Sequence, residues 1–260
     1  MSELVTSNIP LELLGQSGVR FQLGESVVLV DPYLTDRVAE VYGANLKRMV
    51  PAPTAPHDVT DADWVLVTHE HLDHCDPTTL VPIAGASPNV QFMCPNDLRD
   101  HLVQIGIDHS RIVIARETWR DLSDTTRVRS VPAAHPEVER DADGLLKCVG
   151  YLFEHDGRRI YHAGDTSPHA EIFEALNPFL PIQAALLPVN EQNYYRERQD
   201  IIGNMTVREA FQMATDLEVD TLVPIHWDLF APNSVFADEL ELLYEKLAPP
   251  FHMALTPRAV

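Results

Sequence analysis

Four side chains that commonly bind metal ions follow one another closely: His69, His71, Asp73 and His74. They come directly after DWVLV, residues 63–67, a run typical of a buried strand. Where a chain leaves a strand in extended form, residues two apart point to the same side, so His69 and His71 can hold one cation together. Asp73 and His74 then face a second cation nearby. Imidazole and carboxylate ligands suit Zn, Mn or Fe, and the lack of a cysteine ligand argues against a purely structural zinc site.

Three later residues support this interpretation, because each follows an apolar strand of its own. His135 follows VRSVPAA, Asp165 follows RRIYHAG, and His226 follows DTLVPI. Ligands that converge from the ends of several strands form the rigid platform that a metal site requires. The alternative is a solvated histidine-rich turn that binds nothing. The joint arrangement favours the metal site.

The elements that must position these side chains alternate along the chain. Strands are predicted over residues 10–15, 19–23, 26–31, 63–67, 90–94, 111–115, 127–133, 148–154, 159–162, 184–188 and 220–225. Helices are predicted over residues 77–83, 95–105, 168–176, 206–217 and 236–247, with caps at Asp76, Ser167 and Thr206. Residues 32–61 are predicted to form a long irregular segment. This pattern indicates an α/β fold of packed sheets under outer helices, as one domain over residues 1–260.

The charge balance, 19 basic against 39 acidic residues and a net charge of −20, disfavours several kinds of partner. It repels polyanions, so neither nucleic acid nor an anionic membrane surface is expected to bind. A small anionic substrate stays open, because bound cations reverse the local potential. No leader sequence or membrane-spanning run is predicted. The three cysteines, Cys75, Cys94 and Cys148, form no C-x-x-C pair, and a reducing cytoplasm is the expected location.

The ligand motifs together resemble those of the metallo-β-lactamase superfamily: HEHLDH, the lone His135, HAGDT around Asp165 and PIHWD around His226. Within it, LLGQSGVRFQLGESVVLVDPY, YHAGDTS, LLPVNEQN…GNMT and LVPIHWD resemble the L-ascorbate-6-phosphate lactonase-like group. The resemblance covers nearly the whole chain. It implies a four-layer αβ/βα sandwich, the metallo-β-lactamase fold. Glu70 stands where an aspartate is common, which changes contacts behind the ligands without removing one.

The resemblance also implies two divalent metal ions, Mn or Zn, with Fe as the alternative. One ion would be held by His69, His71 and His135, and the other by Asp73, His74 and His226, with Asp165 bridging both. Metal binding can lower the pKa of a water from 15.7 to about 7, which supplies a bridging hydroxide as the nucleophile at neutral pH. Asp73, beside that water, is the candidate catalytic residue for proton transfer.

The function that follows from the resemblance is hydrolysis of a small ester or lactone, with a phosphorylated sugar-acid lactone as one form of substrate. A phosphodiesterase is the main alternative, because related phospholipases share the motifs. An iron-dependent sulfur dioxygenase, which uses one iron, and a non-catalytic metal-binding scaffold are further alternatives. The partner is expected to be a small molecule, and a homo-oligomer is compatible with the resemblance.

Two long irregular segments, residues 32–61 and 190–205, are candidates for setting specificity. The second contains polar, aromatic and cationic residues that could stack on and pair with a small anionic ligand: Asn190, Tyr194, Tyr195, Arg196 and Arg198. A solvated loop is the alternative for this segment.

Some residues near the motifs have more than one interpretation. Asp31 and Asp228 could orient ligand imidazoles, or could serve a turn or a cap. His162 is interpreted as a strand residue and Cys75 as a small packed residue, neither of them a ligand.

Overall fold

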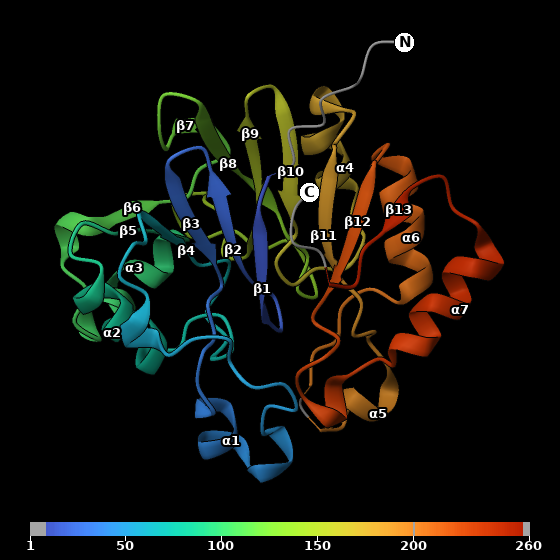
Figure 1. Ribbon diagram of the computed structural model, residues 1–260, viewed down its shortest axis with the longest axis horizontal. Helices are drawn as coiled ribbons and strands as arrows, with labels where there is room; N and C mark the ends of the chain where they lie inside the picture. Colours follow the sequence, from blue (N-terminus) through green and yellow to red (C-terminus); the bar gives the residue numbers. More distant parts are fainter. Residues whose placement is uncertain (1–8, 200, 257–260) are drawn as a thin grey trace.

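Two β-sheets pack face to face, and helices cover the outer face of each (Figure 1). The computed structural model describes residues 9–199 and 201–256. The first sheet has the order β1 to β6: β1 (Leu11–Gly15), β2 (Gly18–Leu23), β3 (Ser26–Val30), β4 (Trp64–Leu66), β5 (Gln91–Cys94) and β6 (Ile112–Ile114). Its first three strands are antiparallel and the rest are parallel.

The second sheet runs from β13 to β7 and is also mixed. Its strands are β7 (Arg120–Asp121), β8 (Thr126–Pro132), β9 (Val149–His155), β10 (Arg158–His162), β11 (Ala184–Pro188), β12 (Thr221–Ile225) and β13 (His252–Met253). Strands β7 to β10 are antiparallel, and β10 to β13 are parallel.

Three layers of apolar packing hold these elements together. Phe21 and Val28 of the first sheet pack with Tyr151 and Phe153 of the second. On the outer faces, α2 (Pro77–Ala86) and α3 (Arg99–Gln104) cover the first sheet, and α4 (Ala170–Leu176), α6 (Val207–Asp216) and α7 (Ala237–Leu247) cover the second. The predicted four-layer α/β sandwich is therefore confirmed.

The predicted caps hold at two helices and fail at a third. Asp76 accepts a hydrogen bond from the Thr78 backbone N–H at the start of α2, and Thr206 forms a capping box with Glu209 at α6. At α4, however, the cap is His169 and the helix begins at Ala170, so the prediction of a Ser167 cap was wrong.

Residues 32–61 are not wholly irregular, which corrects the prediction for this segment. They contain α1 (Arg37–Tyr42) and two short 3₁₀ turns. A six-residue helix is too short to show a helical period or to be stable alone. Its Val38 packs against Tyr33 and Phe230, so tertiary contacts stabilise it.

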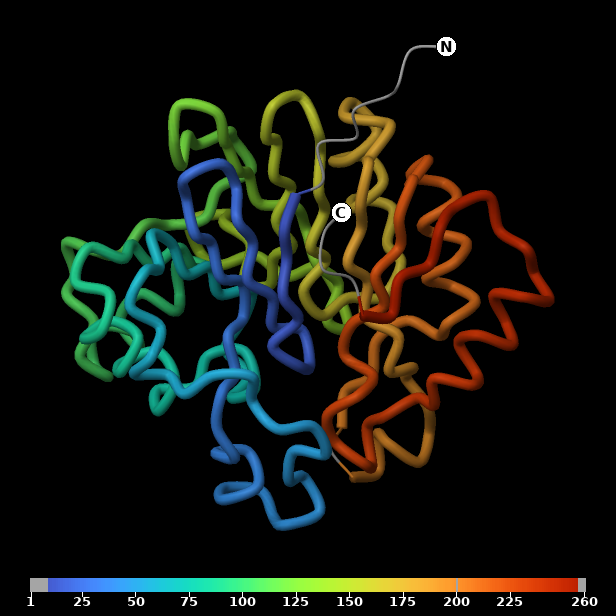
Figure 2. Tube along the Cα trace, in the orientation of Figure 1, coloured from blue at the N-terminus to red at the C-terminus, as the bar shows by residue number. Residues whose placement is uncertain are grey.

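The segment that contains α1 and the segment from β11 to α7 meet at one end of the molecule (Figure 2). The Met49 backbone N–H donates to the Leu229 carbonyl at 2.8 Å, and Arg48 and Phe230 form an isolated β-bridge. α5 (Tyr194–Glu197) lies at the same end. Across the described residues, no helix is both long and apolar enough to cross a membrane.

Candidate metal centre

Strand directions explain why ligands far apart in sequence meet. β8 and β10 are both antiparallel to β9, and β12 is parallel to β10 through β11, so all three run the same way. The turns that follow them therefore lie at one edge of the sheet, and they carry His135, Asp165 and His226. β4 of the facing sheet delivers His69 and the residues after it.

The first group of donor atoms consists of ring nitrogens of His69, His71 and His135. His71 Nδ1 lies 2.9 Å from His69 Nε2 and 3.2 Å from His135 Nε2. Nitrogens bound tetrahedrally to one zinc ion at 2.0–2.1 Å would lie about 3.4 Å apart. The three imidazoles are therefore spaced as ligands of one cation are spaced.

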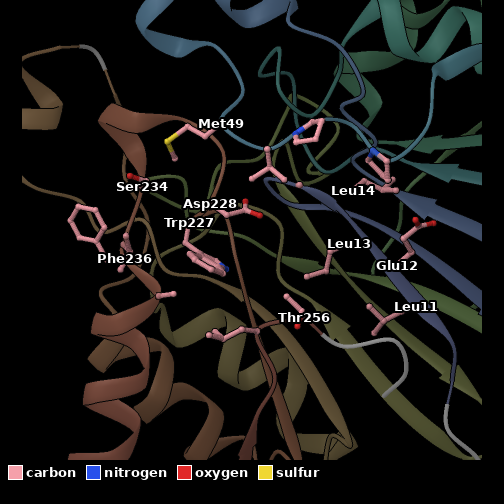
Figure 3. A pocket seen from close by; sticks show the side chains of 17 residues that line it. Leu11, Glu12, Leu13, Leu14, Met49, Trp227, Asp228, Ser234, Phe236 and Thr256 are labelled. Carbon is pink, nitrogen blue, oxygen red and sulfur yellow. The ribbon is translucent and has the colours of Figure 1, made fainter.

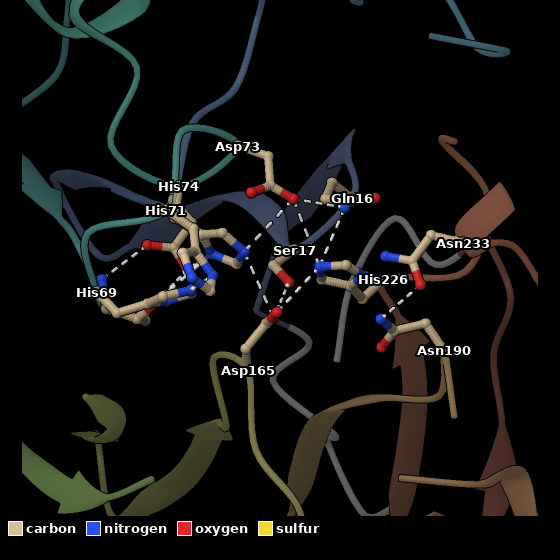
Figure 4. A network of polar contacts seen from close by, with 12 residues as sticks. Gln16, Ser17, His69, His71, Asp73, His74, Asp165, Asn190, His226 and Asn233 are labelled. Atoms are coloured by element: carbon tan, nitrogen blue, oxygen red, sulfur yellow. Dashed lines mark hydrogen bonds and ion pairs between the residues drawn. The ribbon is translucent and has the colours of Figure 1, made fainter. Parts of the chain in front are cut away.

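The second group consists of Asp73, His74 and His226, and Asp165 lies between the two groups (Figure 4). His226 Nε2 is 3.1 Å from Asp165 Oδ2 and 3.5 Å from Asp73 Oδ2. His74 Nε2 is 3.4 Å from Asp165 Oδ1. On the other side, His135 Nε2 is 3.9 Å from Asp165 Oδ2.

The seven side chains thus converge as the sequence predicted. Their donor atoms form three overlapping groups, each within 4.8 Å: His69, His71 and His135; His69, His74 and Asp165; and Asp73, His74 and His226. The residues could hold metal ions, and the ligand role of each stays a prediction.

Two backbone features place the last ligands. His226 has a φ of 61°, in the left-handed region that side chains other than glycine rarely adopt, and its N–H donates to the Gln16 carbonyl at 2.8 Å. Gly164, immediately before Asp165, has a φ of 63°, and a Cβ there would meet the Val149 carbonyl at 2.9 Å. Glycine is therefore required at the turn that delivers Asp165.

One buried carboxylate orients imidazoles of both groups. His74 Nδ1 donates to Asp31 Oδ2 at 2.7 Å, which leaves His74 Nε2 free to bind a cation. The Thr68 hydroxyl donates to the same Asp31 oxygen at 2.6 Å. Because that hydroxyl proton is engaged, Thr68 Oγ1 accepts from His69 Nδ1 at 3.0 Å, and His69 Nε2 is likewise free. Asp31 therefore orients ligand imidazoles, one of the two roles left open for it.

Replacing this carboxylate gives a first testable prediction. Asp31→Asn should weaken metal binding by about 10–100-fold, the usual effect of losing a hydrogen-bond partner behind a ligand. Titration of the metal-free variant with Zn²⁺ or Mn²⁺ measures the change. Asp63→Asn is the matched control, because Asp63 accepts from the Val27 backbone N–H and contacts no candidate ligand. Unchanged affinity in Asp31→Asn would show that the orienting contact is dispensable.

The electrostatics of the centre favour ionised carboxylates. Burial opposes ionisation of Asp165, but the His226 and His74 imidazoles hold its pKa well below the usual range. Burial would lower the pKa of His226, but Asp165 and Asp73 raise it to about 9. Burial lowers the pKa of His135 to about 4. Without a cation His226 is therefore protonated at neutral pH, and cation binding there displaces that proton.

Sequence reasoning missed two residues of the β1–β2 turn. Gln16 Nε2 donates to Asp73 Oδ2 at 2.6 Å, and the Ser17 hydroxyl donates to Asp165 Oδ1 at 3.3 Å. Gln16, Ser17 and Gly18 fall between the strands predicted over residues 10–15 and 19–23, and the two polar side chains were the available signal. Asp228 accepts from the Gln16 backbone N–H at 3.3 Å and so supports this turn; no contact with a ligand imidazole is found for it in the described chain.

His162 and Cys75 are buried without facing the centre as ligands. His162 Nε2–H donates to the Ser17 carbonyl at 2.8 Å, and its Nδ1 accepts from the Gly164 N–H at 3.2 Å. Both ring nitrogens are therefore engaged with the backbone. Cys75 packs in the core beneath α2, and burial raises the pKa of its thiol well above the usual range.

A cavity of about 500 Å³ opens on the centre. Its floor includes candidate ligands from both groups: His71, Asp73, Asp165 and His226. Its walls are apolar side chains and amides: Val38, Tyr42, Asn45, Leu46, Leu72, Gln199, Ile201, Ile202, Phe230 and Asn233. A cavity of this size suits a small molecule.

A larger apolar cavity of about 1000 Å³ lies elsewhere, between β1 and residues 227–237 (Figure 3). Leu11, Leu13, Trp227 and Phe236 line it, and none of the seven candidate ligands does. Four of the seven candidate ligands line the smaller cavity, so we place the candidate site there.

The loop residues predicted to contact substrate have other surroundings. Asn190 is fully buried, where it donates to Asn233 Oδ1 at 3.1 Å and accepts from Asn204 Nδ2 at 2.8 Å. Asn233, which the sequence reasoning missed, lines the cavity, and its amide nitrogen points toward His226 (Figure 4). Asn190 therefore does not line the cavity itself, but its hydrogen bond orients the Asn233 side chain, which does.

The arginines also require a correction. Arg196 is buried, and its guanidinium donates to the backbone carbonyls of Asn190, Glu191 and Ser234. It therefore has a structural role, for which nothing in its sequence neighbourhood gave a signal. Arg198 is exposed and donates to the Tyr194 hydroxyl at 3.0 Å. None of Tyr194, Tyr195, Arg196 and Arg198 lines the cavity over the centre.

The two arginines should respond differently to substitution. Arg196→Ala leaves buried carbonyls without a donor, so we expect the free energy of unfolding to fall by about 1–3 kcal/mol. Arg198→Ala, at an exposed contact, should change it by less than about 0.5 kcal/mol. Urea unfolding of the two variants makes the comparison. Equal losses of stability would contradict the structural role of Arg196.

Comparison with known proteins places this geometry in a family. The model of the β-lactamase superfamily domain matches residues 27–227. A metal-dependent hydrolase of Pyrococcus abyssi is 27% identical over 241 residues, covering 90% of this chain and 92% of that protein. A probable L-ascorbate-6-phosphate lactonase of Salmonella heidelberg is 25% identical over 211 residues, covering 76% of this chain and 58% of the lactonase.

A solved structure described as isothiocyanate hydrolase from Delia radicum gut bacteria has the same fold. Its TM-score is 0.74 at 19% identity, and the match covers 96% of this chain and 98% of that one. The family match spans most of the chain and includes all seven candidate ligands. The chain therefore belongs to the metallo-β-lactamase superfamily and is one of its metal-dependent hydrolases.

Proposed function

We propose that this protein hydrolyses a small ester or lactone at a centre of two divalent cations. The observation that carries the proposal is His74 Nε2, which is buried and has no hydrogen-bond partner within the described chain. A buried polar atom without a partner is costly, and a cation would satisfy it. The candidate ligands form two separate donor groups, one on each side of Asp165, and this arrangement favours two ions over one.

The residues present fit the chemistry of ester hydrolysis. Cations bound here would supply an activated water at neutral pH and polarise the substrate carbonyl. Asp73 accepts the proton of the attacking water at its carboxylate, and the Gln16 amide holds Asp73 Oδ2 in place. Burial opposes ionisation of Asp73, but His74 and His226 keep its pKa below the usual range, so the carboxylate is ionised before the reaction.

The lactone part of the proposal draws on the Salmonella relative described as a probable lactonase. Fold alone does not fix the substrate, because one fold supports many chemistries. The shape and lining of the cavity must therefore select the substrate.

The test begins with protein purified without added metal, whose metal content is measured. Hydrolysis is then assayed with Mn²⁺ or Zn²⁺ on lactones, aryl esters, thioesters, a phosphodiester and an isothiocyanate. We expect ester or lactone turnover that EDTA abolishes and metal restores. Turnover of the phosphodiester alone would replace the proposal with a phosphodiesterase. A single iron per chain with oxygen consumption would indicate a sulfur dioxygenase, and bound metal without turnover would indicate a scaffold.

A further inference from the structure

Away from the candidate ligands, most side chains in the walls of the cavity over the centre are apolar. Val38 and Leu46 come from the α1 segment, Phe230 follows β12, and Ile201 and Ile202 come from the facing loop. The exposed fraction of Val38 is 6% and that of Phe230 is 3%, so these two form a packed wall. Burial of a substrate chain against such walls is favourable through the hydrophobic effect.

Away from the candidate ligands, the described walls of the cavity carry no permanent positive charge that could pair with an anion. Among its described lining residues there is no lysine or arginine, and its carboxylates are the candidate ligands Asp73 and Asp165. Arg48 follows Leu46 by two residues in the chain but does not line the cavity. Its guanidinium donates to the backbone carbonyls of Leu14, Tyr33 and Val50.

The arginines of the facing loop do not supply the missing charge. Arg196 is bound to backbone carbonyls, and Arg198 lies over the Tyr194 ring with its Cζ 5.7 Å from the ring centroid. An anionic group placed against these walls would lose its hydration without gaining a charge-assisted hydrogen bond, and that loss is costly.

The polar groups of the walls suit a neutral acceptor. The Asn233 side chain accepts from Asn190 through Oδ1, and its amide nitrogen points toward His226 (Figure 4). This orientation presents a donor beside the second group of candidate ligands. A neutral carbonyl or ester oxygen can accept from such a donor without needing a counter-charge.

We infer that the substrate is an ester or lactone with a neutral, apolar chain, and that substrates whose chain carries an anionic group, phosphorylated lactones included, are excluded. The inference rests on the proposed function for the reacting group. The inferred charge and apolarity of the substrate's chain are argued from the cavity walls alone. It replaces the earlier expectation that Arg196 and Arg198 hold an anion.

The first arm of the test measures binding, so that it does not depend on turnover. The probes are two γ-lactams, which resemble lactones but are not hydrolysed readily. One carries an alkyl chain, and the other carries a chain of equal length that ends in a sulfonate, an anion that binds divalent metals weakly. We expect the metal-loaded protein to bind the alkyl lactam at least tenfold more tightly. Affinity should rise about fourfold for each methylene added until the cavity is filled. Equal or tighter binding of the sulfonate, or no binding of the alkyl lactam, would overturn the inference.

Substitution of Tyr42, an exposed side chain at the cavity wall, provides the second arm. Tyr42→Arg should strengthen binding of the sulfonate lactam about fivefold, the scale of an exposed ion pair. Tyr42→Gln is the matched neutral variant, and Tyr195→Arg adds the same charge away from the cavity. Neither variant should strengthen binding of the sulfonate lactam. A gain in all three variants would mean that the sulfonate binds elsewhere, which contradicts the inference.

The corresponding lactones separate the inference from the proposed function. Turnover of the alkyl lactone in preference to its sulfonate supports both. If the lactams bind as expected and no lactone or ester is hydrolysed, the proposed reaction fails while the ligand class stands. If the sulfonate lactone is turned over faster, the reaction stands and the ligand class fails.

Discussion

Asp165→Asn is expected to abolish measurable hydrolysis and to reduce the metal content of the protein. Asp165 lies within 3.9 Å of ring nitrogens from both ligand groups, so one substitution weakens both. Losing several kcal/mol of stabilisation by the ions corresponds to a fall in turnover of about 10³-fold or more. Metal analysis after dialysis measures the first effect, and steady-state kinetics on a substrate found in the hydrolysis screen measures the second.

The control for this variant is Asp61→Asn, because Asp61 is exposed and pairs with Arg20 far from the centre. It should keep both metal content and turnover. Asp165→Asn protein that retains its full metal content and hydrolyses normally would contradict a bridging role for this residue.

Asp73→Asn is expected to lower turnover by at least about 10²-fold, the usual scale for a general acid–base group. The substitution keeps the size of the side chain but removes its charge and its capacity to accept a proton. Metal held by His69, His71 and His135 should largely remain, because Asp73 belongs to the other donor group. The pairing of lost turnover with retained metal separates this variant from Asp165→Asn.

The level of turnover in Asp73→Asn decides the role of this residue. Near-normal turnover would show that Asp73 neither transfers the proton nor binds an ion that the reaction needs.

Much of the candidate centre was predictable from local sequence, and there is a physical reason. A ligand that follows an apolar strand is placed by that strand, so the pattern of strand and ligand is readable without the fold. His69, Asp165 and His226 were found in this way. The caps of α2 and α6 were also found, because a cap depends on residues only two or three positions apart.

The residues around the ligands could not be predicted in the same way. Gln16 and Ser17 lie in the turn between β1 and β2, and local sequence gives no sign of their distant partners. Gln16 contacts Asp73, which follows another strand of the same sheet, and Ser17 contacts Asp165, which follows a strand of the other sheet. The role of Asp31 was one of two open interpretations, because its partner His74 is 43 residues away. Contacts of this kind depend on which strands lie side by side in a sheet and on how the two sheets pack.

The residues that line the cavity, and so would determine substrate specificity, were the hardest to predict from local sequence. The segment from 32 to 61 becomes a cavity wall because Val38 packs against Phe230, which follows a strand of the other sheet. Arg196 looked like a ligand for an anion, since an isolated arginine gives no sign of its partners, but backbone carbonyls from two segments enclose it. The sequence alone determined the fold class and the residues that could bind metal. Only the tertiary structure decided which side chains face the substrate, because that choice depends on partners brought together from distant parts of the chain.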